Sequence, residues 1–109
     1  MAEPSLIQVF GANATQTATQ LVISKADLAE VGLTALATNT AESLFTALFL
    51  KSSRYLNTIS QTTNPDIQVT IADSFQNIVT RNEQNYRQRV FNANFEELLP
   101  TDVLDPDNY

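Results

Sequence analysis

The sequence predicts an α+β domain, and three observations support that fold class. A helical spacing of apolar residues runs through residues 40–58, without Gly or Pro. Alternating or β-branched residues typical of strands lie on both sides of it, at 15–23 and 67–71. The 109 residues, 43% apolar, suit one globular domain. We therefore expect the order β-β-α-β-β, with one long helix packed on a mainly antiparallel sheet. A small β barrel with the helix plugging one end is the second interpretation.

The first part of the chain predicts a hairpin followed by a short connection. Residues 6–10 (LIQVF) form the first expected strand, 11–13 the turn, and 15–23 (TQTATQLVI) the second strand. The segment SKADLAEVG, 24–32, has two interpretations. It forms a short helix capped by Ser24 and ended by Gly32, or it is a plain loop.

The long helix is predicted at 40–58. Asn39 and Glu42 have the spacing of a capping box at its start. One apolar stripe follows, made by Ala41, Leu44, Phe45, Leu48, Tyr55 and Ile59. Phe49 and Leu50 widen the stripe beyond the area that one sheet covers. We expect the loop 24–38 to cover most of this excess, and a second subunit to cover the remainder.

The second part of the chain predicts another pair of strands. A turn at 62–66 (TTNPD) leads into the strand 67–71 (IQVTI), which 75–80 continues after a break near Asp73. Residues 81–85 (RNEQN) are expected to form a polar loop. In the strand at 86–95, Phe91, Ala93 and Phe95 share one face with Arg87 and Arg89.

The end of the chain differs in composition from the rest. Residues 1–95 carry seven acids against six bases, so the C-terminal acids account for nearly all of the net charge of −6. We expect one compact domain over 1–96, followed by an acidic, Pro-containing arm over 97–109. Its apolar residues favour an arm that attaches to a neighbour. The alternatives are an arm packed on its own domain, or a mobile one.

The residue types argue against several classes of function. The chain has no Cys, His or Trp and only two Gly, so thiol chemistry, histidine catalysis and phosphate-binding loops have no candidates. We expect no enzyme, cofactor or metal site. The acidic balance and the absence of a basic run argue against nucleic-acid binding, and we expect Arg87 and Arg89 to pair with the chain's own carboxylates. The absence of a long apolar segment and of a signal peptide predicts a soluble protein of the cytoplasm, without membrane contact.

What remains is function through the surface of the protein. We expect a non-enzymatic structural or assembly protein, acting by self-association as a homo-oligomer or by docking into a larger complex. By analogy of composition alone, a virion- or phage-like particle is one example of such a complex. The alternative is a small-molecule or peptide-binding module with a pocket between helix and sheet. The candidate interaction residues are Phe49, Leu50, Arg87, Arg89, Leu98, Leu99, Val103, Leu104 and Tyr109.

Overall fold

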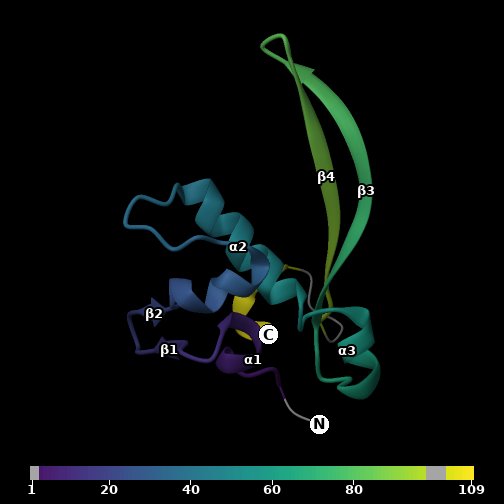
Figure 1. Cartoon of the computed structure of the whole chain (residues 1–109). Coiled ribbons are helices and arrows are strands. Elements are labelled where there is room, and N and C mark those ends of the chain that lie inside the picture. The colour runs from purple at the N-terminus through teal and green to yellow at the C-terminus, as the bar shows by residue number, and fades with distance from the viewer. Residues whose placement is uncertain (1–2, 98–102) are drawn as a thin grey trace.

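The computed structural model describes residues 3–97 and 103–109, which form a mainly helical body and a long projecting β-hairpin (Figure 1). Helices and antiparallel strands together confirm the α+β class. The described elements are, in order, α1 (Leu6–Phe10), β1 (Thr15–Gln16), β2 (Leu21–Val22), the 3₁₀-helix η1 (Lys25–Val31), α2 (Ala41–Ser53), α3 (Thr58–Thr63), β3 (Val69–Arg81), β4 (Gln84–Phe95) and the 3₁₀-helix η2 (Pro106–Asn108).

The N-terminal segment is a helix, so the strand predicted at 6–10 is wrong. A capping box starts α1: the Ser5 hydroxyl accepts from the Gln8 amide at 3.2 Å, and the Gln8 side chain accepts from the Ser5 amide at 2.9 Å. This reciprocal pair satisfies backbone donors that a helix start otherwise leaves free. The cap therefore outweighs the strand preference of the β-branched residues that follow.

The predicted strand at 15–23 folds back on itself instead of pairing with residues 6–10. Thr15 pairs with Val22, and Gln16 with Leu21, in a two-stranded ribbon. The Thr17 hydroxyl accepts from the amide of Gln20 at 3.1 Å and so closes the turn between the two short strands. Threonine side chains compete with the ladder for backbone groups in this way, which splits a run that reads as one strand.

The helical interpretation of residues 24–32 is confirmed. Ser24 caps η1 by accepting from the Ala26 amide at 3.3 Å, and Gly32 ends it with a left-handed φ of +100°. Leu28 on this element is 2% exposed. The short helix thus places one of the most buried apolar side chains of the body.

Helix α2 begins and ends differently from the prediction. Its cap is Thr40, whose hydroxyl accepts from the Ser43 amide at 3.1 Å, and not Asn39. The helix stops at Ser53 instead of continuing to 58. Asn57 explains the stop: its side chain donates to the Ser53 carbonyl and accepts from the Ser60 amide, which starts α3. One side chain therefore ends one helix and begins the next.

The buried apolar core is small. Helix α2 packs against α1 and η1, and a few contacts join it to β3. The buried apolar residues among those described are Val9, Ala14, Leu28, Ala47 and Ile67. A core of this size stabilises a body of modest dimensions and leaves the far end of the hairpin without support.

The described strands form two separate two-stranded sheets. The expectation of one sheet under the helix is therefore wrong, and the described strands do not close into the alternative barrel. The strands β3 and β4 pair with each other from Val69↔Phe95 to Arg81↔Gln84. The β3 strand predicted to continue past Asp73 is confirmed, while the loop predicted at 81–85 shortens to a two-residue turn.

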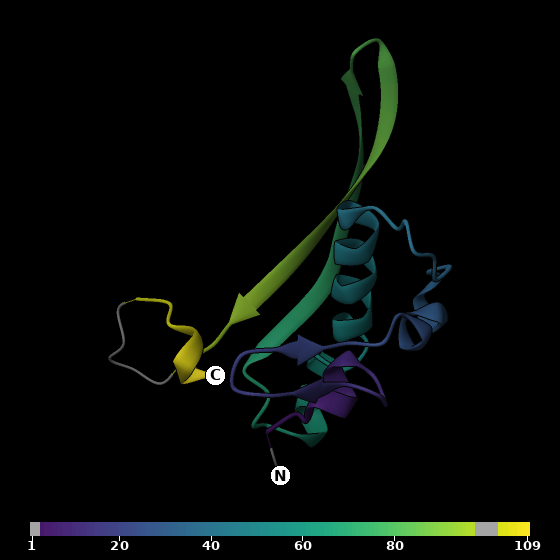
Figure 2. The ribbon, with the colours of Figure 1, turned by 90° about the vertical axis from the view of Figure 1, so that its left-hand side faces the viewer.

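The projecting hairpin makes the molecule extended for its mass. The radius of gyration is 16.1 Å, against about 13 Å for a compact domain of this length. The accessible surface is 8130 Å², whereas a folded monomer of 12.0 kDa exposes roughly 6,000 Å². Figure 2 shows the cause: the base of the hairpin runs beside α2, and its outer part extends beyond the other elements.

Candidate interaction surface on the long hairpin

The tip of the hairpin is a tight turn of two residues. Asn82 and Glu83 have positive φ angles of 51° and 62°. Turns with two such residues match the twist of the flanking strands, which lets β3 and β4 stay paired to the end. Since neither residue is Gly, the sequence lacks the usual signal for this turn.

A β-bulge at Ser74 divides the hairpin into a base and a distal half. Asp73 lies opposite Phe91 and Phe75 lies opposite Val90, so Ser74 has no partner position on β4. One extra residue moves every following side chain of that strand to the other face of the ribbon. Phe75 and Val79 therefore point to the face opposite that of Val69 and Ile71.

One face, called here the charged face, carries most of the ionised side chains of the two strands. Its distal pairs are Gln76–Arg89, Ile78–Arg87 and Thr80–Asn85, and its base carries Asp73 and Phe91. Arg89 forms an ion pair with Asp73 at 2.6 Å and lies over the Phe91 ring. The expected pairing with an internal carboxylate is thus met by Arg89, whereas Arg87 has no ion-pair partner in the described part of the chain.

The base of the charged face packs against the body. The Phe49 ring of α2 meets the Phe91 ring edge-on, with centroids 5.3 Å apart. Phe49 also contacts Phe45 on its own helix, at 6.2 Å between centroids. The predicted interaction residue Phe49 therefore joins the hairpin to the body. This contact fixes which face of the ribbon turns toward α2.

The opposite face, called here the neutral face, has no acidic side chain along its length. Alternation and register place on it the pairs Thr70–Asn94, Ala72–Asn92, Phe75–Val90, Asn77–Gln88, Val79–Tyr86 and Arg81–Gln84. Its one ionised group is Arg81, which lies 4.5 Å from the centre of the Tyr86 ring. Two apolar pairs separated by an uncharged amide pair form the middle of the face.

The distal half of the neutral face is open. The Phe75 side chain is 57% exposed, and Tyr86 also counts among the exposed residues. An isolated two-stranded hairpin is at best marginally stable in water. Neither strand contains Pro or Lys, two residues that commonly block pairing at an exposed strand edge. The distal half therefore exposes apolar side chains and unblocked strand edges together.

The described end of the tail lies on the base of the hairpin. The Tyr109 ring meets the Phe95 ring edge-on at 6.1 Å, and its hydroxyl donates to Glu97 at 3.0 Å. Burial, and then this hydrogen bond, raise the pKa of Tyr109 above its ordinary value. Gln68 adds a bond to the Asn108 carbonyl at 3.2 Å. At least the last residues of the predicted arm thus contact their own chain.

Four other tail residues were predicted to bind a neighbour. Val103 and Leu104 are largely exposed, and Leu104 borders a small apolar hollow with Val69 and Phe95. Leu98 and Leu99 lie outside the described residues. The candidate role of these four residues in binding a neighbour stays a prediction.

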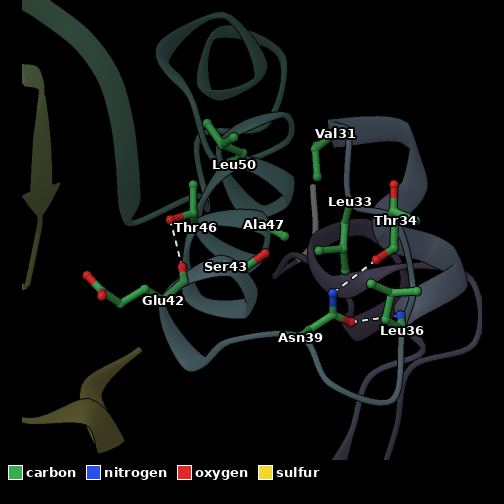
Figure 3. A pocket seen from close by; sticks show the side chains of 11 residues that line it. Val31, Leu33, Thr34, Leu36, Asn39, Glu42, Ser43, Thr46, Ala47 and Leu50 are labelled. Carbon is green, nitrogen blue, oxygen red and sulfur yellow. Dashed lines mark hydrogen bonds between the residues drawn. The ribbon is translucent and has the colours of Figure 1, made fainter. Parts of the chain in front are cut away.

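Leu50 lines a hollow of about 550 Å³ between α2 and the segment after η1 (Figure 3). The hollow does not lie between helix and sheet, where the alternative interpretation places a pocket. Two of its polar side chains are engaged. The Asn39 side chain accepts from the Leu36 amide and donates to the Thr34 carbonyl. Thr46 donates to the Glu42 carbonyl at 2.8 Å. These bonds hold the loop in place and occupy groups that a ligand would otherwise bind.

The sequence prediction missed Phe75, Val79, Tyr86 and Val90. A signal for them existed on β4, where the apolar residues change from odd to even positions between Phe91 and Val90. Without the bulge, Phe75 and Val79 continue the alternation of Val69 and Ile71 and read as residues facing the body. Only the paired register shows that the apolar residues of both strands move to the other face at the same level.

Among the described residues, no helix has the length and apolar character needed to cross a membrane. Comparisons of the chain with protein-family models, with curated proteins and with solved structures found no match.

Proposed function

We propose that this protein is a non-enzymatic assembly component that associates with copies of itself, and that its long hairpin makes the association. One observation carries the proposal: the distal half of the hairpin exposes apolar side chains far from the only core that the described residues contain. A face of this kind is stable when another surface covers it. The same hairpin would suit a subunit of a larger particle.

The surface area supports association. The chain exposes roughly 2,000 Å² more than a compact monomer of its mass. A specific interface buries about 800 Å² on each partner. The excess is therefore large enough for a full interface.

The distribution of charge supports a protein partner over a nucleic acid. Residues 75–90 carry three arginines and one glutamate, a net charge of +2, while the rest of the chain carries −8. Phosphate binding depends on several clustered cations, and the acidic body would repel a nucleic acid held nearby. Copies of the chain carry the same acidic body, but a nearly neutral contact face keeps those charges away from the contact.

The experiment is a mass measurement by size-exclusion chromatography with light scattering. We expect the full chain to elute with a multiple of the 12.0 kDa monomer mass. In a shortened variant, an Asn-Gly turn replaces residues 76–89, which keeps Phe75 opposite Val90. We expect this variant to stay folded by circular dichroism and to elute as a monomer. A full-length chain that is monomeric at high micromolar concentration would refute the proposal.

A ligand-binding module is the second proposal, and the hollow beside α2 favours it. Its volume of about 550 Å³ falls within the range of small-molecule sites. The internal bonds of Asn39 and Thr46 make it the weaker candidate. A fragment screen by NMR tests it: shifts clustered on Leu33, Ser43 and Leu50 would support the module, whereas scattered or absent shifts would count against it.

A further inference from the structure

We propose that two copies stack the neutral faces of their hairpins about a two-fold axis, each hairpin tip lying over the base of the partner's hairpin. The inference rests on the proposed function and adds the face, the symmetry and the direction of the contact. The partner is a second copy of this chain.

The chain's own body covers the neutral face at its base, where Thr70 is only 4% exposed, and leaves the distal half uncovered. Phe49 of α2 packs on Phe91, which lies on the charged face. The bulge at Ser74 turns Phe75 and Val79 to the other side of the ribbon, and on β4 Tyr86 lies on that side too. With the exception of Ile78, which lies on the charged face, both strands thus present their distal apolar residues away from α2, which leaves them for a partner.

The composition of this face suits a copy of itself. In a two-fold interface, each patch meets the same patch, so a face rich in charges of one sign would repel its copy. Asp73, Arg87 and Arg89 all lie on the charged face. The neutral face offers the pairs Phe75–Val90 and Val79–Tyr86, with the amides of Asn77 and Gln88 between them to hydrogen-bond across the contact.

Charge complementarity sets the direction of stacking. Arg81, the one ionised group of the neutral face, lies at the tip. The base carries acids: Asp66 and Glu96 are exposed there, beside Glu97, and together they border a hollow of about 540 Å³. If the hairpins run in opposite directions, each Arg81 approaches the partner's acids. If they run in the same direction, the two Arg81 side chains approach each other.

The opposed arrangement also buries more surface. The neutral face extends over the full length of β3, 13 residues, or about 40 Å at the usual rise per residue. Tip-over-base stacking uses the exposed part of this length, from the small side chains of Ala72 and Asn92 to the tip, and stops short of the buried Thr70. Contact between the tips alone would leave much of the exposed area uncovered.

The first test compares Val79→Asp with Ile78→Asp. Both changes place an acid at neighbouring positions of the distal β3, but on opposite faces. We expect Val79→Asp to yield a monomer in light scattering and Ile78→Asp to keep the oligomer mass, both with the wild-type circular dichroism spectrum. Equal loss of mass in the two variants, or loss only in Ile78→Asp, would overturn the assignment of the face.

The second test exchanges the charges of Arg81 and Glu96. Within one chain these residues lie at opposite ends of the hairpin, so any rescue must act between copies. We expect Arg81→Glu and Glu96→Arg each to raise the dissociation constant at least tenfold, and the double variant to regain most of the affinity. A double variant no tighter than either single variant overturns the opposed direction, although self-association itself survives. A monomeric wild type would instead remove the proposed function.

Discussion

The base and the distal half of the same hairpin differ in what holds them. At the base, Phe91 contacts Phe49 of α2, and Phe95 contacts Tyr109 of the tail. Above the bulge, Phe75 and Ile78 are 57% and 66% exposed, and the contacts shown there lie within the two strands. The ladder continues unbroken through both halves apart from Ser74.

This difference shows that backbone pairing and side-chain support are separate requirements. The two strands satisfy each other's inner backbone groups along their length, which is enough to define the ribbon. Pairing does not bury apolar area on either face, and burial is the larger stabilising term. The base obtains that burial from its own chain, whereas the distal half obtains it from a partner if the proposed association holds.

The largest expected change in the free energy of unfolding comes from a substitution in the core of the body. We expect Leu28→Ala to lower the free energy of unfolding by about 2–5 kcal/mol, because Leu28 is 2% exposed and its removal leaves a cavity. Ile78→Ala on the distal hairpin should change it by less than about 0.5 kcal/mol. Urea denaturation of the full-length protein at low concentration, with and without each substitution, measures both. Similar losses of unfolding free energy in the two variants would show that the distal half is packed as tightly as the core, and would contradict the contrast.

A comparison of two phenylalanines tests the base against the distal half directly. We expect Phe91→Ala to destabilise the monomer by roughly 1–3 kcal/mol, since it removes the contact with Phe49 and the support of Arg89. Phe75→Ala should leave monomer stability nearly unchanged and weaken self-association. Denaturation at low protein concentration isolates the first effect, and light scattering isolates the second. A reversal of the two effects would contradict the division of the hairpin at the bulge.

Parts of the fold were readable from the sequence, and the reasons for the failures are physical. The strand at 86–95 was predicted from alternation alone. The helix α2 was predicted from the spacing of its apolar residues. The helix α1 was missed although Ser5 and Gln8 have capping spacing, because β-branched residues within the element suggested a strand. Local patterns also cannot show pairing partners, so the separation of the two hairpins was out of reach.

The candidate site was harder to predict than the fold. Arg87 and Arg89 were correctly placed on the face of Phe91 because β4 keeps a regular alternation. The neutral face depends on Ser74, a residue that carries no bulge signal of its own. Tail residues such as Tyr109 were predicted to bind a neighbour. The sequence indicates that an apolar residue needs a contact, but it does not show whether its own chain or another chain provides that contact.

A smaller effect concerns the tip of the distal half. Glu83 holds a φ of 62°, which costs an L-residue roughly 1 kcal/mol and costs Gly almost nothing. We expect Glu83→Gly to slow hydrogen exchange of the distal amides of β3 and β4 and to leave the body unchanged. Asn82→Gly is the matched control and should have a weaker effect, because Asn tolerates this conformation better. Faster exchange in Glu83→Gly would argue that a contact of the glutamate, and not backbone strain, governs the tip.

The smallest effect tests the tail at the base through pH. Because burial and the bond to Glu97 raise the pKa of Tyr109 above 10.0, the folded state holds this proton more tightly than the unfolded state does. The stabilisation is therefore complete below pH 10 and declines as pH rises through the folded pKa. Tyr109→Phe keeps the ring against Phe95 and removes the titrating hydroxyl, so we expect it to lessen the alkaline decline in melting temperature. If both proteins decline equally above pH 10, the bond to Glu97 does not stabilise the base, and the tail acts there only through its ring contact with Phe95.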